Sequence, residues 1–204
     1  MRNAQDELAE IKSIMERSSR FLSLSGLSGI LAGVYALIGS GIAYSLIYYP
    51  KPPYGKALSL TNPEYVISNV MITGLSVLLL SVFTAWLLSR KKSKKTKVSL
   101  WAPASRRFMR ALFIPVIIGG LLCIGLYAQG QEHLVAAITL IFYGLGLINA
   151  SNFTLNEIKY LSYCQLILGL IATFFPEYGL VLWALGFGVL HIIYGAIMYV
   201  KYDG

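Results

Sequence analysis

Charged residues are scarce in this chain of 204 residues, at 13% against roughly 25% in an ordinary soluble domain. Hydrophobic residues make up 56%, and the mean hydropathy is +0.66. This composition excludes a typical soluble domain and indicates a membrane protein. Because each bilayer-spanning helix takes about 20 residues, the apolar runs leave no length for a separate soluble domain.

Cysteine and histidine are also scarce, and each shortage removes a class of chemistry. Cys123 and Cys164 lie in apolar runs, where a thiol behaves as a small buried hydrophobe, so we expect no disulfide. His133 and His191 are the two histidines of the chain. They are too few for a zinc site, which needs three or four converging ligands, and poorly placed for bis-histidine haem. We therefore expect no metal and no cofactor.

Carboxylates are missing from the centres of the apolar runs. The four glutamates near these runs all lie at run ends: Glu64, Glu132, Glu157 and Glu177. Carriers coupled to protons or sodium usually need a charge or an unwound helix at the bilayer midplane. The shortage argues against an ion-coupled carrier and leaves a neutral-solute channel or transporter open.

Six apolar runs of spanning length predict an all-α polytopic bundle of six transmembrane helices. They cover about residues 21–49, 65–88, 108–129, 134–151, 158–175 and 178–199. We expect a single transmembrane domain over 21–204. Before it, Leu8, Ile11 and Met15 recur at helical spacing, which predicts a short amphipathic helix within 1–20 that lies on the cytoplasmic side.

The positive residues are strongly segregated along the chain. With both termini on one side, that side holds 15 of the 17 lysines and arginines: four before the first run, nine between Arg90 and Arg110, and Lys159 and Lys201. Lys51 and Lys56 lie opposite, in a proline-rich loop over 50–63. Since cytoplasmic loops are enriched in positive residues, we expect both termini in the cytoplasm of a multi-pass inner-membrane protein.

The run of bases from Arg90 to Lys97 has two interpretations. It could bind anionic lipid headgroups or a nucleic acid. A topology signal beside a span explains the same bases without any partner. We therefore predict the lipid bilayer as the partner of this chain and no nucleic acid.

Small residues line one face of the first run. Ser25, Gly29 and Gly33 follow each other at spacings of four, so another helix backbone could approach closely there. One alternative is packing against another helix of the same chain. The other is association with a second copy or another membrane protein.

His191 is the most distinctive single residue, because ionisable groups inside a membrane are functional candidates. It could equally be a neutral, hydrogen-bonded packing residue. A polar path through the bundle would draw on a small set of side chains, for which interhelical hydrogen bonding is the alternative role. The set is His191, Asn149, Asn152, Asn69 and Gln165.

Gly26-Leu27-Ser28-Gly29 resembles the GxSG serine motif of rhomboid intramembrane proteases, which place their catalytic histidine in the sixth span, as His191 is placed here. Rhomboids carry that serine in the fourth span, whereas Ser28 lies in the first. No counterpart of their oxyanion segment is found, so we expect no enzyme and name no catalytic residue.

The stretches MERSSRFLSLSGLSGILAGVYALIG and FPEYGLVLWALGFGVLHIIYGAIMY resemble small bacterial six-helix membrane proteins of unassigned function. The hairpin 169–199, with its GL, FP and YG pattern, is distantly similar to the acid-resistance membrane protein family. We expect a non-enzymatic membrane component, regulatory or stress-related, that acts by helix association as a homo-oligomer or with a membrane partner. A small-solute channel or transporter is the alternative, and an intramembrane enzyme a distant third.

Overall fold

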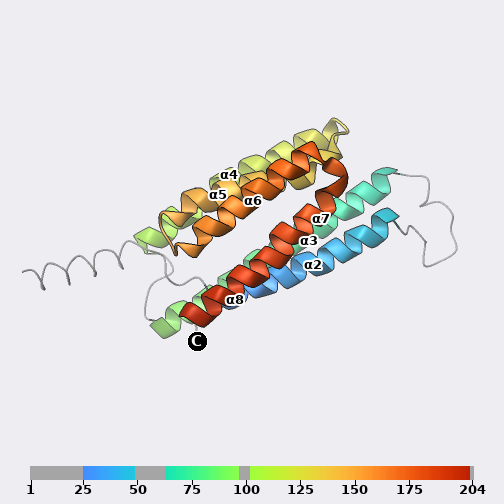
Figure 1. Cartoon of the computed structure of the whole chain (residues 1–204). Coiled ribbons are helices and arrows are strands. Elements are labelled where there is room, and N and C mark those ends of the chain that lie inside the picture. Colours follow the sequence, from blue (N-terminus) through green and yellow to red (C-terminus); the bar gives the residue numbers. More distant parts are fainter. Residues whose placement is uncertain (1–24, 49–62, 97–101, 203–204) are drawn as a thin grey trace, which may run out of the picture.

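The computed structural model describes residues 25–48, 63–96 and 102–202, and these residues form helices joined by short turns, with no strand among them (Figure 1). The all-α bundle predicted from the apolar runs is confirmed. The predicted amphipathic helix within 1–20 and the proline-rich loop up to residue 62 lie outside the described residues.

Six helices make up the described bundle. The first five are α2 (Gly26–Tyr48), α3 (Pro63–Thr96), α4 (Pro103–Ala128), α5 (Val135–Ser151) and α6 (Glu157–Phe174). The sixth is continuous but changes type along its length, through α7 (Gly179–Trp183), the π-helical segment η4 (Ala184–Leu190) and α8 (His191–Tyr202). Short 3-10 turns, Glu132–Leu134 and Pro176–Tyr178, precede the fourth and the sixth helix.

Five of these helices are long and apolar enough to cross a membrane, namely α2, α3, α4, α5 with its preceding turn, and the sixth helix. The fifth predicted span, α6, has 18 residues, about 27 Å at 1.5 Å per residue, against roughly 30 Å of hydrocarbon. It begins with Glu157 and Lys159, which shorten its apolar part further. The length and apolar composition of these five helices indicate a multi-pass membrane protein.

The helices form two groups, which Figure 1 shows as an upper and a lower layer. In one group α5 packs between α4 and α6, and in the other α2 packs between α3 and α8. The sixth helix crosses between the groups, because α7 contacts α5 and α6 whereas η4 and α8 contact α2 (Figure 1). The π-helical segment therefore lies where the chain passes from one group to the other.

Two helix boundaries differ from the sequence prediction around the basic run. We expected a span ending near residue 88 and a basic loop, but α3 continues as a helix to Thr96. Lysine and arginine are good helix formers, and the next helix breaker is Pro103, so nothing in the local sequence ends the helix earlier. That proline then starts α4 five residues before the expected span, since proline suits the first turn of a helix.

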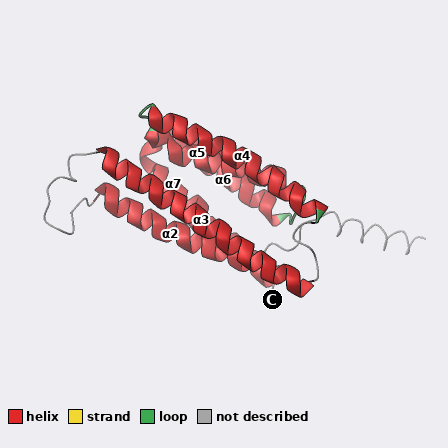
Figure 2. Ribbon diagram, turned by 180° about the vertical axis from the view of Figure 1, so that it is seen from behind, coloured by secondary structure: helices red, strands yellow, loops and turns green. Residues whose placement is uncertain are grey.

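One end of the molecule carries nearly all of its described positive charge. The end of α3 and the start of α4 lie together here, near the C-terminal end of α8, on the left in Figure 1 and on the right in Figure 2. We call this the basic end, defined by the described side chains of Arg90, Lys91, Lys92, Lys94, Arg106, Arg107, Arg110, Lys159 and Lys201. The segregation predicted from the sequence thus places these bases together in space.

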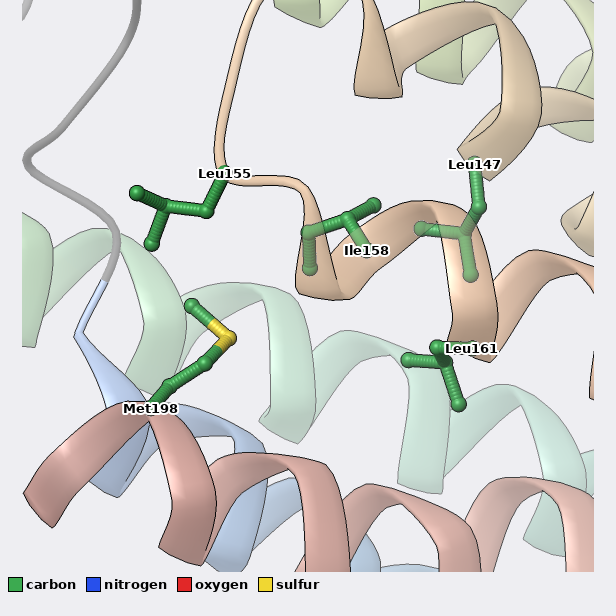
Figure 3. Close-up of a cluster of buried hydrophobic side chains, with 5 residues drawn as sticks. All are labelled: Leu147, Leu155, Ile158, Leu161 and Met198. Carbon is green, nitrogen blue, oxygen red and sulfur yellow. The ribbon is translucent and has the colours of Figure 1, made fainter. Parts of the chain in front are cut away.

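An apolar cluster closes the two groups against each other near the basic end. Figure 3 shows Met198 of α8 pointing toward the start of α6, where Leu155, Ile158 and Leu161 converge with Leu147 of α5. Each of these side chains is at most 5% exposed. This cluster is one of the contacts between the groups, which also meet around α7 and the π-helical segment.

Candidate functional site

Polar side chains from three helices meet at the middle of the bundle. The hydroxyl of Tyr143, on α5, lies 2.8 Å from Nε2 of His191, the first residue of α8. Nδ1 of His191 lies 2.9 Å from the carbonyl oxygen of Gly186, which also accepts a hydrogen bond of 2.8 Å from Nε2 of Gln165 on α6. Tyr143 and Gln165 lie near the midpoints of α5 and α6, and His191 lies near the midpoint of the whole sixth helix, so this cluster lies halfway along the bundle, where the middle of a bilayer is expected. We call it the midplane cluster: Tyr143, Gln165, His191 and the Gly186 carbonyl.

The partners of His191 determine which of its nitrogens carries the proton. A carbonyl oxygen only accepts hydrogen bonds, so Nδ1, which faces Gly186, must be the donor. In a neutral imidazole Nε2 is then the acceptor, and the hydroxyl of Tyr143 donates to it. His191 is 8% exposed, and both of its ring nitrogens are hydrogen-bonded without any charge in the apolar interior.

The π-helical segment explains how one backbone carbonyl serves two side chains. In a π-helical turn the backbone hydrogen bonds join residues five apart, one more than in an α-helix, and such turns often occur at functional sites. Gly186 lies inside η4, and its missing Cβ makes room for Gln165, since a Cβ there would lie 2.6 Å from Oε1 of Gln165. Glycine at this position therefore allows the amide of α6 to reach the carbonyl.

Aromatic rings surround the hydrogen bonds of the midplane cluster. The rings of Tyr143, Phe187 and His191 lie within 5.1 to 5.8 Å of one another, centroid to centroid. Trp183 extends the stack, with its centroid 4.9 Å from that of Phe187. Rings at these distances favour one another beyond the area they bury, so the polar groups are held in a rigid apolar frame.

One polar atom of the midplane cluster lacks a partner. Gln165 is 0% exposed, and its Oε1 accepts no hydrogen bond from the described residues. The orientation of the amide is fixed, because flipping it would set two oxygen atoms against each other at Gly186. A buried acceptor without a donor has a free-energy cost of about 1–3 kcal/mol.

The structure separates the five residues of the predicted polar path. Gln165 and His191 meet at the midplane cluster. Asn149 and Asn152 lie exposed where α5 ends, and the side chain of Asn152 donates to the carbonyl oxygen of Asn149. Asn69 lies on α3, in the other helix group. The set therefore does not form one route through the described residues.

The rhomboid-like pairing of Ser28 with His191 is not formed. The hydroxyl of Ser28 donates to the carbonyl oxygen of Ser25 at 2.6 Å. Both nitrogens of His191 bond Gly186 and Tyr143 instead. Each group thus has its hydrogen bonds elsewhere, and the geometry provides no serine nucleophile activated by a histidine.

The small-residue face of α2 lies against the sixth helix of the same chain. A Cβ on Gly29 would lie 3.1 Å from Cα of Gly195, and one on Gly33 would lie 2.6 Å from the carbonyl oxygen of Gly188. Ser25, at the start of this face, is also buried, at 8% exposure. Of the two roles that the sequence allowed, packing within the chain is the one that the structure has, and this face is not free for a second copy.

An ionic contact joins α6 to α8 at the basic end. Nζ of Lys201 lies 2.6 Å from Oε1 of Glu157, and the hydroxyl of Tyr202 donates to both carboxylate oxygens at 3.0 and 3.2 Å. Partial burial opposes ionisation of Glu157, but the hydrogen bonds from Lys201 and Tyr202 outweigh it and hold the pKa of this carboxyl below its usual range. We call these three residues the latch.

An apolar groove of about 280 Å³ lies between α6 and the π-helical segment. Its lining residues are Cys164, Ile167, Leu168, Leu185, Val189 and Leu190. No polar atom lines it, so it suits hydrocarbon and gives no passage to a polar solute.

Two residues of the midplane cluster were missed by the sequence analysis. Tyr143 was one of 14 tyrosines in the chain, and Gly186 one of several glycines in the sixth run. A signal does exist for Tyr143, since it lies at the centre of its run whereas most tyrosines lie near the ends, where they prefer the membrane interface. The π turn that exposes the Gly186 carbonyl leaves no comparable signal in the sequence.

Comparison with known proteins adds no relative to this picture: no protein-family model, no curated protein and no solved structure matches the chain. The resemblances noted in the sequence stay predictions. Among the described residues no three His, Cys, Asp or Glu side chains come together as metal ligands.

Proposed function

We propose that this chain is a non-enzymatic membrane component that acts by lateral association of its helices, with α3 as the associating surface. The supporting observation is that, among the described helices, α3 packs extensively only against α2. In its most apolar stretch of 18 residues, none is buried within the chain. The exposed side chains include Ile72, Leu75, Leu79, Leu80 and Phe83.

Exposure to lipid alone does not drive association, because lipid tails are as apolar as leucine. Close backbone approach at small residues does, through van der Waals packing. On α3, Gly74, Ser81 and Ala85 recur at spacings of seven and four and share one partly exposed face, which borders the α2 contact of Val77 and is distinct from the fully exposed side. A Cβ on Gly74 would meet nothing within 4 Å, which leaves this glycine unused by the fold. We infer that the α3 face of a second copy packs there.

Replacement of Gly74 by leucine tests this proposal. Because the space beside Gly74 is empty, Gly74→Leu should leave thermal unfolding in detergent unchanged and lower the dimer fraction at least fivefold. The matched control is Gly120→Leu on α4, where the space is equally empty. Dimer fraction is measured by subunit counting in lipid nanodiscs. A monomeric wild-type protein, or equal loss in both variants, would contradict association through α3.

The proposal extends to location and role. The concentration of bases at one end supports an orientation with that end in the cytoplasm of a bacterial inner membrane. A component that works by association suits a regulatory or stress-related role, in which a membrane partner replaces the second copy. Cysteines placed at Lys51 and Lys56 should react with impermeant reagents from outside the cell, whereas labelling only after lysis would overturn this orientation.

A small-solute channel or transporter is the second candidate, and one observation favours it. The buried, unpartnered Oε1 of Gln165 is an acceptor at the middle of the bundle, beside a π-helical segment of the kind often found at functional sites. A solute with an N–H or O–H donor would satisfy it when the two helix groups separate. Gln165→Leu should then abolish uptake of small amides or alcohols into proteoliposomes, and the absence of any wild-type uptake would end this candidate.

A further inference from the structure

The ends of the described molecule differ sharply in charge. The nine bases of the basic end face one described carboxylate, Glu157, which is already engaged in the latch. At the opposite end the described charged side chains are two carboxylates, Glu132, which is partly exposed, and Glu177, which is exposed. A topology signal needs bases near a span, but it needs no particular arrangement of them on a helix. The bases on α4, in contrast, are arranged on one face of the helix.

Three arginines occupy one face of the first turns of α4. Arg106, Arg107 and Arg110 are all exposed, and at 100° per residue they fall within a sector of about 100°. No carboxylate pairs with them within the described part of the chain. They lie at the start of the helix, where the helix dipole also favours an anion.

The same face of α4 continues into the membrane as hydrocarbon. Beyond Arg110 it carries Ile114, Ile117, Leu121 and Ile124, which are 57% to 64% exposed. The opposite face holds Ala104, Phe108, Gly119 and Cys123, which are buried within the chain. The exposed face is thus cationic at the membrane edge and apolar below it, with no residue of the described chain covering it.

The dimensions of this face match one lipid molecule. From Arg110 to Leu121 the helix rises about 16 Å, at 1.5 Å per residue. One leaflet supplies about half of the roughly 30 Å hydrocarbon core. An acyl chain that starts at the arginines therefore runs alongside the isoleucines to the middle of the bilayer.

We propose that this face of α4 is a binding site for an anionic phospholipid. The headgroup phosphate is held by Arg106, Arg107 and Arg110, and one acyl chain lies along Ile114, Ile117 and Leu121. Guanidinium groups bind phosphate in a bidentate fashion, which favours them over the lysines at the end of α3 as the seat of the headgroup. The proposal is independent of association through α3, because it uses the opposite helix group.

Native mass spectrometry of the purified full chain tests the site. The probes are phosphatidylglycerol and phosphatidylcholine with the same acyl chains. We expect phosphatidylglycerol to bind at least tenfold more tightly. Replacing Arg106, Arg107 and Arg110 together by glutamine should remove that preference, since each base near an anionic surface contributes about a fivefold factor.

The matched control removes equal charge from the end of α3, by replacing Arg90, Lys91 and Lys94 with glutamine, and should keep most of the preference. Equal loss in both triple variants would mean diffuse attraction and would overturn the site. So would equal binding of the two lipids. Displacement of the lipid by soluble glycerol phosphate would show a phosphate site without an acyl chain and would also contradict the proposal. If the triple variant on α4 fails to fold, Arg110→Gln alone should still weaken binding severalfold.

Discussion

At the scale of single residues, the molecule depends on a few polar atoms placed where water is absent. Tyr143 donates to a histidine whose other nitrogen is already bonded to Gly186. Interhelical hydrogen bonds of this kind contribute modestly in membranes, about 0.6 kcal/mol on average and up to about 2 kcal/mol. The contribution is larger where loss of the donor leaves a buried acceptor unpaired.

Tyr143→Phe should destabilise the chain by about 1–2 kcal/mol, because Nε2 of His191 then lies buried without a donor. The measurement is unfolding of the purified protein in mixed micelles, followed by circular dichroism. Tyr163→Phe on α6 is the control, since Tyr163 is 42% exposed and its hydroxyl makes no hydrogen bond to another described side chain. Equal destabilisation by both changes would show that the bond to His191 contributes nothing.

Gly195→Ala should lower the free energy of unfolding by about 1–3 kcal/mol, because the new methyl group meets backbone atoms that cannot move independently. A Cβ there would lie 2.8 Å from the carbonyl oxygen of Gly26, so α2 and α8 would have to separate. Gly41→Ala on α2 provides the comparison, since the space beside Gly41 is open. Thermal unfolding in detergent measures both variants, and an unchanged midpoint for Gly195→Ala would contradict the close packing.

Sequence reasoning found part of the midplane cluster and missed the rest for a physical reason. His191 and Gln165 stood out because polar side chains are costly inside a membrane. Tyr143 and Gly186 did not, because a tyrosine or a backbone carbonyl becomes part of a site only when helices from distant parts of the chain bring it there. The glycines of α2 likewise predicted a close helix contact, while the sequence left open whether the partner was another helix of the same chain or a second copy.

At the scale of helices, the apolar runs predicted the number and order of the elements but not their internal form. The sixth run looks like an ordinary span, yet its centre is π-helical. The local sequence is compatible with either winding and carries no signal for the wider turn. α3 shows the complementary case, since its helix runs through the charges that we took for a loop.

Deletion of Val189 should convert the π-helical segment to α-helix. The helix on either side would keep nearly the same facing, because a π turn holds one residue more than an α turn. The carbonyl oxygen of Gly186 would return to the α-helical hydrogen-bond pattern and lose its bonds to Gln165 and His191, so we expect a larger loss of stability than for Tyr143→Phe. Deletion of Val200, which is 79% exposed near the end of α8, is the control. Comparable stability of the two deletions in detergent would mean that the wide turn has no structural role.

At the scale of the whole molecule, two helix groups meet at three levels. The start of the sixth helix, α7, packs on α5 and α6 at one end, the midplane cluster joins the groups at the centre, and the latch with its apolar cluster joins them at the basic end. The groups therefore share little continuous surface. We expect a change at any one level to alter the packing of the two groups against each other. A partner bound to an outer helix would thereby change the arrangement of the other group.

The latch makes the stability of this arrangement depend on pH. The pKa of Glu157 lies below its usual range in the folded chain. A carboxyl whose folded pKa is lowered stabilises the fold above its unfolded pKa, about 4.3, and this contribution is lost as the pH falls through the folded pKa. We expect the unfolding midpoint of the wild-type chain to drop below about pH 4 more steeply than that of Glu157→Gln. The control is Glu177→Gln, an exposed carboxylate at the opposite end, which should keep the wild-type slope. Because Lys201 is 59% exposed, salt should weaken the effect, and identical slopes for the wild type and Glu157→Gln at low salt would show that the latch does not hold the groups together.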